Sequence, residues 1–319
     1  MSNIVELNPV PQDYIGGMAF VGHDQFVVAC WDGSVTLYSV DENNMIADVN
    51  RITHTAGLIS VAVVLDYVFV GSVEGELFFV DFENGTLVES GENSSNLGIC
   101  SLCSSKAHII TGSWDGLLQV VDPYSNLVVS KHQLPKGEKI LAIDGTENGM
   151  LLVGSTGKHI RLFKIDEYGQ LNQTSNLDFR LKFQIRDIKI APDFQSYAYG
   201  GIDGRVAVEY FENPTQTYAF RCHYLNLEDA QITYPVNSIC FAPNTNTLYT
   251  SGSDGLVSLW DLSIRKRIQQ FPRFNNNAVV KLICNGRILL VATSDDSFKT
   301  NAVNDEVELA NSQIYLVRL

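Results

Sequence analysis

The sequence predicts an all-β protein, a seven-bladed β-propeller built from four-stranded blades. Three observations predict it: a hairpin pattern recurs along the chain, its copies are almost evenly spaced, and helical periodicity is nearly absent. The pattern is clearest in SYAYGGIDGRVAVEYF, where Asp203-Gly204 separates two runs rich in β-branched and aromatic residues. A two-residue type I′ turn needs positive φ, which glycine adopts easily, so we expect a tight hairpin there.

Six other segments align with this hairpin. In chain order the seven copies read FVVACWDGSVTLYSV, VFVGSVEGELFFVDF, IITGSWDGLLQVVDP, LLVGSTGKHIRLFKI, SYAYGGIDGRVAVEYF, LYTSGSDGLVSLWDL and a degraded copy that begins LLVATSDDSF and resumes at SQIYLVRL. The aligned turn positions recur at steps of about 41 to 51 residues, at Gly33, Gly75, Gly116, Lys158, Gly204, Gly255 and Asp296. This period is typical of a propeller blade and predicts seven blades.

The two ends of the chain are expected to pair. After SQIYLVRL the chain ends at Leu319, so the last copy has three strands and lacks a fourth. An unassigned apolar alternation, NIVEL, runs from Asn3 to Leu7. We therefore expect this N-terminal strand to complete the last blade and close the ring, which leaves no open sheet edge between the ends.

The chain is expected to be one domain. No linker rich in Pro, Gly or Ser divides residues 1–319, of which 45% are hydrophobic. Residues 297–311, SFKTNAVNDEVELAN, interrupt the last hairpin and are polar, so we expect a mobile loop there. No apolar run reaches the ~18 residues of a membrane span, and the N-terminus lacks a signal-peptide pattern. These features favour a soluble, intracellular protein.

Nothing in the sequence predicts a catalytic residue, a metal site or a cofactor. The six histidines follow no metal-ligand or triad spacing, although a triad assembled in space stays open. Cys100 and Cys103 form a C-x-x-C without a second pair, and in a strand they point to opposite faces. The run GSTGK at residues 154–158 lacks the spacing of a nucleotide-binding loop. An interaction scaffold is therefore favoured over an enzyme.

The charge balance bears on the kind of partner. The chain has 22 basic and 36 acidic residues and a formal net charge of −14. Binding a nucleic-acid backbone requires several aligned Lys or Arg side chains. Direct binding of nucleic acid or of a membrane is therefore not expected, although a local basic patch stays open.

Three arginines and two tryptophans are candidate ligand-binding residues. Turns between the second and third strands of the blades should share one rim with the entry to each first strand. Trp31 and Trp114 precede two such turns, and Arg205 follows a third. Arg186, near the start of the first strand of blade 5, and Arg221, near the end of its fourth, should join them. Guanidinium forks match phosphate and carboxylate geometry, so this set predicts an anion site with aromatic walls.

A structural interpretation of the same residues stays open. A rim arginine is usually solvated or paired with a carboxylate, and Glu209 is available to Arg205. A turn tryptophan can simply cover a junction between blades. It is the convergence of the five residues, rather than any one of them, that favours a binding site.

The copy SGSDGLVSLWDL resembles the WD40 family, because Trp260-Asp261 ends its third strand as in that repeat. The other copies end differently, in LYSV, FVDF, VVDP, LFKI and EYFE. The hydrogen-bonded tetrad that stiffens a consensus WD40 blade is therefore not expected in most of them.

Several longer segments resemble one branch of that family, the Bub-type WD40 proteins of the spindle assembly checkpoint, above all the budding-yeast form. These segments are GIDGRVAVEYF, YAFRCH, YPVNSICFAPNTNTLYTSGSDG, NLGIC and LVATSDDSFKTNA, and the resemblance covers nearly the whole chain. The sister branch, the nucleoporin-binding mRNA-export WD40 proteins, shares a version of the same hairpin and is the alternative. RVAVEY and the run from Tyr234 favour the checkpoint branch.

The resemblance implies a non-enzymatic scaffold in the nucleus, located at kinetochores in mitosis, that works as a monomeric propeller within hetero-complexes. It implies that Arg186 meets glutamates of a helical GLEBS segment in a checkpoint kinase or Mad-type partner. It also implies a site that reads phosphothreonine in Met-Glu-Leu-Thr repeats of a kinetochore scaffold. That site would use Trp31, Trp114, Arg205 and Arg221. Members of the family usually carry a basic residue where this chain has Tyr224, so phosphate affinity is expected to be lower or supplied elsewhere.

Overall fold

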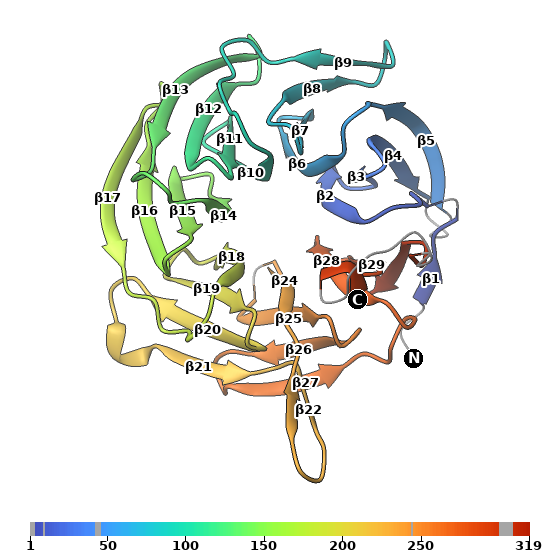
Figure 1. The fold of residues 1–319 in the computed structure, drawn as a ribbon, viewed down its shortest axis with the longest axis vertical. Helices are drawn as coiled ribbons and strands as arrows, with labels where there is room; N and C mark the ends of the chain where they lie inside the picture. Colours follow the sequence, from blue (N-terminus) through green and yellow to red (C-terminus); the bar gives the residue numbers. More distant parts are fainter. Residues whose placement is uncertain (1–3, 9, 42–45, 244, 300–308) are drawn as a thin grey trace. The chain divides into compact units, whose positions relative to one another are not determined.

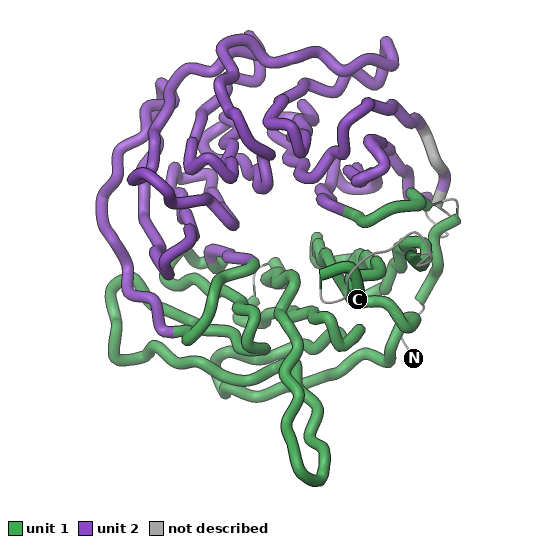
Figure 2. Tube along the Cα trace, in the orientation of Figure 1, with its two compact units in different colours: residues 1–15, 181–186, 191–319 green, residues 16–180, 187–190 purple. Residues whose placement is uncertain are grey.

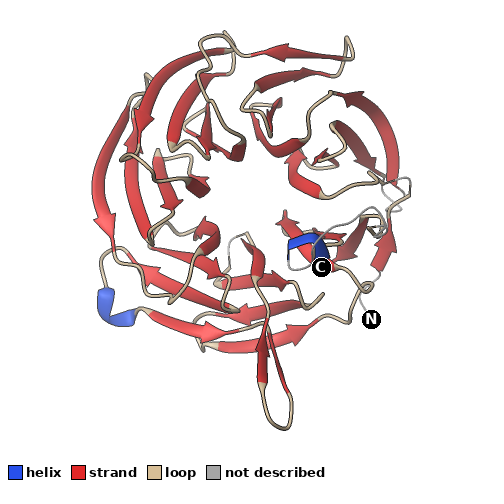
Figure 3. Ribbon diagram, viewed as in Figure 1, coloured by secondary structure: helices blue, strands red, loops and turns tan. Residues whose placement is uncertain are grey.

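The computed structural model describes the whole chain except residues 1–3, 9, 42–45, 244 and 300–308. The described residues form seven four-stranded sheets and one separate two-stranded hairpin (Figures 1 and 3). Helical structure in the described part is confined to two 3-10 turns, η1 (Pro214–Gln216) and η2 (Ser297–Lys299). The fold is therefore an all-β, seven-bladed β-propeller, and the fold class predicted from the sequence is confirmed.

The chain clusters into two compact units (Figure 2). Unit 1 comprises residues 1–15, 181–186 and 191–319, and unit 2 comprises residues 16–180 and 187–190. The prediction that residues 1–319 form a single domain stays a prediction.

Unit 2 contains four sheets, and the strands of each pair in chain order. Only Ile15, the first residue of the first sheet, clusters with unit 1. The first has β2 (Ile15–Val21), β3 (Gln25–Cys30), β4 (Ser34–Val40) and β5 (Ile46–Thr53). The second has β6 (Leu58–Val64), β7 (Tyr67–Ser72), β8 (Leu77–Asp81) and β9 (Thr86–Glu89). The third has β10 (Ile99–Ser105), β11 (His108–Ser113), β12 (Leu117–Asp122) and β13 (Leu127–Gln133). The fourth has β14 (Ile140–Gly145), β15 (Met150–Ser155), β16 (His159–Ile165) and β17 (Leu171–Leu177).

The remaining sheets belong to unit 1, except that residues 187–190 of β18 cluster with unit 2. The fifth sheet has β18 (Ile185–Ile190), β19 (Ser196–Gly201), β20 (Arg205–Tyr210) and β21 (Tyr218–Arg221). The hairpin of β22 (Tyr224–Asn226) and β23 (Gln231–Thr233) follows. The sixth sheet has β24 (Val236–Phe241), β25 (Thr247–Gly252), β26 (Val257–Asp261) and β27 (Lys266–Gln270). The last has β28 (Ala278–Cys284), β29 (Ile288–Ser294), β30 (Gln313–Arg318) and β1 (Ile4–Glu6).

The N-terminal strand completes the last sheet, as predicted. β1 pairs antiparallel with β30, and Val5 lies opposite Leu316. The pairing continues beyond β1, because the Leu7 amide donates a 2.8 Å hydrogen bond to the Ile314 carbonyl. Of the loop predicted at residues 297–311, residues 297–299 form η2, and residues 300–308 lie outside the described residues.

β-Branched side chains fill the space between neighbouring sheets of unit 2. Val27 and Val35 of the first sheet share a buried cluster with Leu58, Val61 and Val70 of the second. Burying one such side chain contributes ~1.5–3 kcal/mol. Because a one-residue slip would turn these side chains away from the core, the alternation fixes the strand register.

The two residues of the C-x-x-C lie in different surroundings. Cys103 is buried in a hydrophobic cluster, and burial raises the pKa of its thiol well above the usual value. Cys100 lies at a register shift in β10. Its thiol donates to the carbonyl oxygens of Gly112 at 3.4 Å and of Ile140 at 3.2 Å. Cys103 thus behaves as a small buried hydrophobe.

The hairpin turns are not of the predicted type I′. That type requires positive φ at both central residues. Gly204 has φ +70°, but Asp203 is not among the positive-φ residues. In the first sheet, Gly33 has φ +80° and its amide donates to the Cys30 carbonyl at 3.1 Å. This is a three-residue loop, a type I turn followed by a left-handed glycine, so the Asp-Gly pattern predicts the hairpin correctly but not its turn type.

The described residues include a complete WD40 tetrad, in which the His, Asp and Thr are buried and the Trp is partly buried. His223 Nδ1 lies 2.8 Å from Asp254 Oδ1, and His223 Nε2 lies 3.1 Å from Thr250 Oγ1. The Trp260 indole donates to the same Thr250 oxygen at 3.0 Å. The network joins the segment after β21 to the sixth sheet, so it anchors the chain at His223, two residues beyond Arg221.

Candidate functional site

Arg205 and Arg221 lie directly opposite each other in the fifth sheet. Arg205 begins β20, Arg221 ends β21, and the two residues are register partners in an antiparallel pair. Facing residues in such a pair have Cβ atoms about 4.5–5.5 Å apart, and like charges there are destabilising. An anion bound between the two guanidinium groups would remove this repulsion.

The carboxylates near this arginine pair neutralise it only in part. Arg205 Nε lies 4.0 Å from Asp203 Oδ2, at the outer limit of an ion pair, and the Arg205 side chain is 38% exposed. Asp203 Oδ1 is buried without a hydrogen-bond partner. Arg221, which is exposed, donates through Nη1 to the neutral amide oxygen of Gln231. Donors of both arginines therefore stay available to a ligand.

Glu209 is not the partner of Arg205, which corrects the sequence-based alternative. Glu209 is only 5% exposed and accepts a 3.1 Å hydrogen bond from the Tyr199 hydroxyl. Four residues of β-strand separate Glu209 from Arg205, which is about 13 Å at the usual rise. Residues four apart in a strand lie on the same face of the sheet, which suggested the pairing of Arg205 with Glu209. The distance between them along the strand is too long for an ion pair.

Arg186 lies at the same end of this sheet and is held by a polar chain. The Ile202 amide, in the β19–β20 turn, donates to the Gln184 carbonyl at 3.1 Å. Arg186 Nη2 donates to Asn237 Oδ1 at 3.0 Å. Asn237 Nδ2 in turn lies 3.1 Å from Ser253 Oγ, and Ser253 donates to Asp296 Oδ2 at 2.6 Å. The arginine is thus oriented by the sixth sheet and by the segment after β29.

A lysine that the sequence reasoning missed stands near Arg186. Lys299 Nζ donates to the Tyr14 hydroxyl at 2.7 Å and lies 4.3 Å from the centre of the Tyr14 ring. Burial, together with the positive charge of Arg186, lowers the pKa of Lys299 to about 8. Burial also raises the pKa of Tyr14 to about 12. The site around Arg186 therefore contains a second cation whose charge titrates near neutral pH.

The two predicted tryptophans lie in unit 2. Trp31, between β3 and β4, is 39% exposed. Trp114, between β11 and β12, is half-buried against Gly98. A Cβ on Gly98 would lie 2.8 Å from Trp114 Cε3, so this glycine makes room for the indole. Trp31 thus has the more accessible ring, and Trp114 also has a structural role in its own sheet.

The hairpin after Arg221 is a feature that the sequence reasoning did not identify. β22 and β23 project from the rest of unit 1 (Figure 1). Tyr224, Leu225 and Ile232 are each more than 40% exposed. The sequence signal for this hairpin was a short alternation of apolar and polar residues on either side of Leu-Glu-Asp-Ala. Because the hairpin is an insertion, it explains why the step from Gly204 to Gly255 is the longest between repeats. Tyr224, opposite Thr233, lies within this hairpin.

The described residues offer neither a metal centre nor a membrane-spanning helix. Among the described residues, no group of three or more His, Cys, Asp or Glu side chains is arranged to hold a metal ion. No helix in the part of the chain that the structure describes has the length and apolar character needed to cross a membrane.

Comparison with known proteins first defines the class. The WD40 family profile, described as WD domain, G-beta repeat, matches residues 216–261, the segment that contains the tetrad. The structure is similar to a solved structure titled "Structure of U3-55K", with a TM-score of 0.80, 14% sequence identity, and coverage of 99% of this chain and 98% of that one. The protein is therefore a WD40 β-propeller.

Its relatives by sequence define it further. The chain is 28% identical over 307 residues to "Mitotic checkpoint protein BUB3.1" of Arabidopsis thaliana, which covers 91% of this chain and 86% of that protein. It is also 28% identical over 285 residues to "mRNA export factor rae-1" of Caenorhabditis elegans, which covers 83% and 72%. This is a WD40 protein with Bub3 homologues that is also related to mRNA export factors.

Proposed function

We propose that this chain is a non-enzymatic scaffold of the mitotic spindle checkpoint that reads phosphorylated peptides. It acts in the nucleus and, during mitosis, at kinetochores, where it recruits checkpoint proteins as a monomer within hetero-complexes. The facing arginines, Arg205 and Arg221, are the observation that carries the proposal. The similarity to a protein named for the mitotic checkpoint supports the setting.

The arginine pair binds phosphothreonine in this proposal. A phosphothreonine carries a charge of about −1.5 to −2 at neutral pH and presents three acceptor oxygens. Two guanidinium groups can donate to it bidentately, and each charge-assisted hydrogen bond contributes ~1.5–3 kcal/mol. The ligand is a phosphorylated Met-Glu-Leu-Thr repeat of a kinetochore scaffold. Trp31 and Trp114 contact its flanking apolar residues, a role that rests on the resemblance.

The site around Arg186 binds the GLEBS segment of a checkpoint kinase or Mad-type partner. Arg186 keeps a fixed orientation through Asn237, so little side-chain entropy is lost when a glutamate of the segment binds. Lys299 adds a second positive charge nearby, and the Asp296 carboxylate partly offsets the charge of Lys299. An acidic helical segment complements this balance of charges.

The test of the phosphate site is fluorescence anisotropy with paired phosphorylated and unmodified Met-Glu-Leu-Thr peptides. Arg205→Ala and Arg221→Ala should each weaken binding of the phosphorylated peptide about tenfold to a hundredfold and leave the unmodified one almost unchanged. Arg273→Ala, which removes an exposed arginine of unit 1, is the matched control. Equal affinity of the wild-type protein for both peptides would count against the proposal, as would an undiminished phosphate preference in Arg205→Ala.

A second candidate is an mRNA-export adaptor that binds a nucleoporin GLEBS motif and RNA. The observation that favours it is the mRNA export factor of Caenorhabditis elegans, which is as similar in sequence as the checkpoint relative, at 28% identity. A pull-down from nuclear extract distinguishes the two. Recovery of a checkpoint kinase and a kinetochore scaffold supports the first function, whereas nucleoporin and poly(A) RNA support the second.

A further inference from the structure

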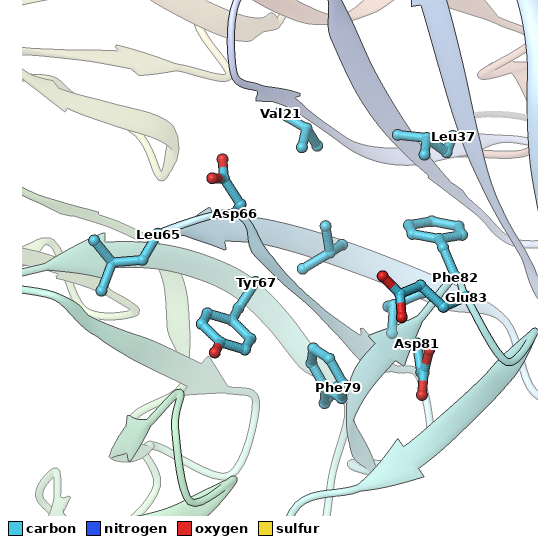
Figure 4. Close-up of a pocket in the computed structure, with 11 residues that line it drawn as sticks. Val21, Leu37, Leu65, Asp66, Tyr67, Phe79, Asp81, Phe82 and Glu83 are labelled. Carbon is cyan, nitrogen blue, oxygen red and sulfur yellow. The ribbon is translucent and has the colours of Figure 1, made fainter.

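A pocket of about 520 Å³ lies between the first and second sheets of unit 2 (Figure 4). Its apolar wall comes from both sheets, with Leu37 from β4 and Tyr67 and Phe79 from β7 and β8. Phe82, just after β8, completes this wall, and its carbonyl accepts a 2.6 Å hydrogen bond from Asn50 of β5. The volume lies within the range of ligand sites, and the two sheets are joined at its edge.

The charged residues that line this pocket among the described residues are all acidic. Asp66, Asp81 and Glu83 line it, and no Lys or Arg is among the described residues that do (Figure 4). Asp81 accepts from the Asn84 backbone amide at 3.0 Å and from its side-chain amide at 2.7 Å. The hydrogen bond from the Asn84 side chain is the main cause that lowers the pKa of Asp81. The pocket therefore combines aromatic surface with three carboxyl groups.

The β6–β7 turn at the edge of this pocket has a backbone conformation that is unfavourable for its residues. Leu65 has φ +48° and Asp66 has φ +67°, a conformation that L-residues other than Asn and Asp rarely adopt. Leu65 is also 52% exposed. An exposed leucine held in this conformation contributes nothing to the core, so its side chain is available as an apolar lip beside the acidic residues.

The pocket is separate from the turns that carry the candidate ligand-binding residues. Tyr67 begins β7 and Asp81 ends β8, whereas the turn that carries Gly75 joins the other ends of these two strands. The pocket thus lies at the opposite end of the second sheet from the turn that matches the Trp31 turn of the first. A ligand here would not compete for the residues of the proposed function.

We propose that this pocket binds an arginine or lysine side chain presented by a basic segment of a partner protein. The cation lies against the faces of Tyr67 and Phe79 and pairs with Asp66 and Glu83, while its methylene stem contacts Leu65. Charge complementarity identifies the occupant: the pocket has three carboxylates, and the chain carries a formal net charge of −14, which attracts basic segments over long range.

The experiment measures anisotropy of a fluorescein-labelled peptide in which arginines alternate with serine and leucine. A second peptide carries citrulline, the neutral isostere, at every arginine. We expect the full-length protein to bind the arginine peptide in preference to the citrulline peptide. In the variant Asp66→Asn with Glu83→Gln, affinity should fall about fivefold to thirtyfold at low salt. Asn tolerates the positive φ of residue 66, so the turn is preserved.

The matched control removes two carboxylates from the same two turns of the fourth sheet. Glu147 lies between β14 and β15 and Glu167 between β16 and β17, and both are exposed. The variant Glu147→Gln with Glu167→Gln changes the net charge equally and should alter affinity less than twofold. An equal loss in both double variants would overturn the proposal in favour of diffuse attraction. Equal binding of the citrulline peptide would also overturn it.

Leu65→Asn separates a binding role from a structural one. Asn is better suited than Leu to positive φ, so the variant should be at least as stable as the wild type in urea unfolding. Affinity for the arginine peptide should nevertheless fall about twofold to fivefold as the apolar lip is lost. Unchanged affinity would overturn the role of Leu65. Displacement of the peptide by free spermidine at equal charge concentration would overturn the assignment to a protein segment.

Discussion

Two arginines near the start of a third strand show opposite environments. In the fourth sheet, Arg161 is 5% exposed, and its Nη1 lies 2.8 Å from Glu138 Oε2 and 2.9 Å from Ser155 Oγ. In the fifth sheet, the Arg205 side chain is 38% exposed and faces Arg221, and the carboxylate it pairs with, Asp203, lies 4.0 Å away. Arg161 is paired within the protein, whereas Arg205 and Arg221 face each other and keep donors available to a ligand. The comparison teaches that the partners of a charge, and not its residue type, distinguish a structural arginine from a candidate binding arginine.

The largest effect is expected at the structural arginine. Arg161→Ala should lower the free energy of unfolding by about 3–5 kcal/mol, because Glu138 is left without its counter-charge in a mostly buried position. Arg205→Ala should change it by less than about 0.5 kcal/mol or raise it, since repulsion from Arg221 is relieved. Urea unfolding of both variants checks this. Similar losses in the two variants would erase the distinction between the two arginines.

The next effect concerns Arg186, which is proposed to bind a ligand and is also anchored within the protein through Asn237. Arg186→Glu places a negative charge against the glutamates of a GLEBS peptide, and truncating a paired charge alone costs ~2–5 kcal/mol in binding. Calorimetric titration should therefore show binding reduced at least thirtyfold, while unfolding still follows one cooperative transition. Arg273→Glu, at an exposed site, controls for charge reversal. Wild-type affinity in Arg186→Glu would remove this residue from the site.

A smaller effect is expected at Trp31. Trp31→Ala removes apolar contact but no charge, so it should weaken the phosphorylated and unmodified Met-Glu-Leu-Thr peptides alike, by about 1–2 kcal/mol. Its effect should change less with salt than the effect of Arg205→Ala, because salt screens only the charged interactions. Anisotropy at two salt concentrations measures both. A loss of affinity confined to the phosphorylated peptide would indicate that Trp31 contacts the phosphate rather than the flanking apolar residues of the peptide.

The smallest effect is a pH dependence that separates the two proposed sites. Lys299 has a pKa of about 8, lowered mainly by burial, so it is charged below that pH and largely neutral above pH 9. Affinity for an acidic GLEBS peptide should therefore fall about twofold to fivefold between pH 7 and pH 9. The Lys299→Met variant should show a flat profile. Phosphopeptide binding should be flat in both proteins, since guanidinium groups do not titrate in this range.

The architecture could be predicted because each repeat carries its own local signal. An Asp-Gly turn between alternating runs specifies a hairpin without reference to the rest of the chain. NIVEL could be placed because it was the remaining apolar alternation and the last blade lacked a strand. The predicted turn type was wrong because the loops contain three residues rather than two. In a three-residue loop only the glycine needs positive φ, whereas a two-residue type I′ turn also requires it of the aspartate.

The candidate site was only partly predictable. Arg205, Arg221 and Arg186 could be assigned to one end of a sheet from their positions in the repeat. The direct pairing of Arg205 with Arg221 could not be predicted, because it depends on the length of the β20–β21 connection, which includes η1. The contact between Lys299 and Tyr14 joins residues 285 positions apart, and no periodicity predicts a contact between two irregular segments.

The pairing of β1 with β30 constrains how the protein can mature on the ribosome. Val5 is synthesised 311 residues before its partner Leu316. At a synthesis rate of about 5–20 residues per second, about 15 to 60 s pass between them. During that interval β1 is an unpaired strand, and its contacts have the largest sequence separation in the last sheet, which makes them slow to form. The native pairing of β1 therefore cannot begin until almost all of the propeller has been synthesised.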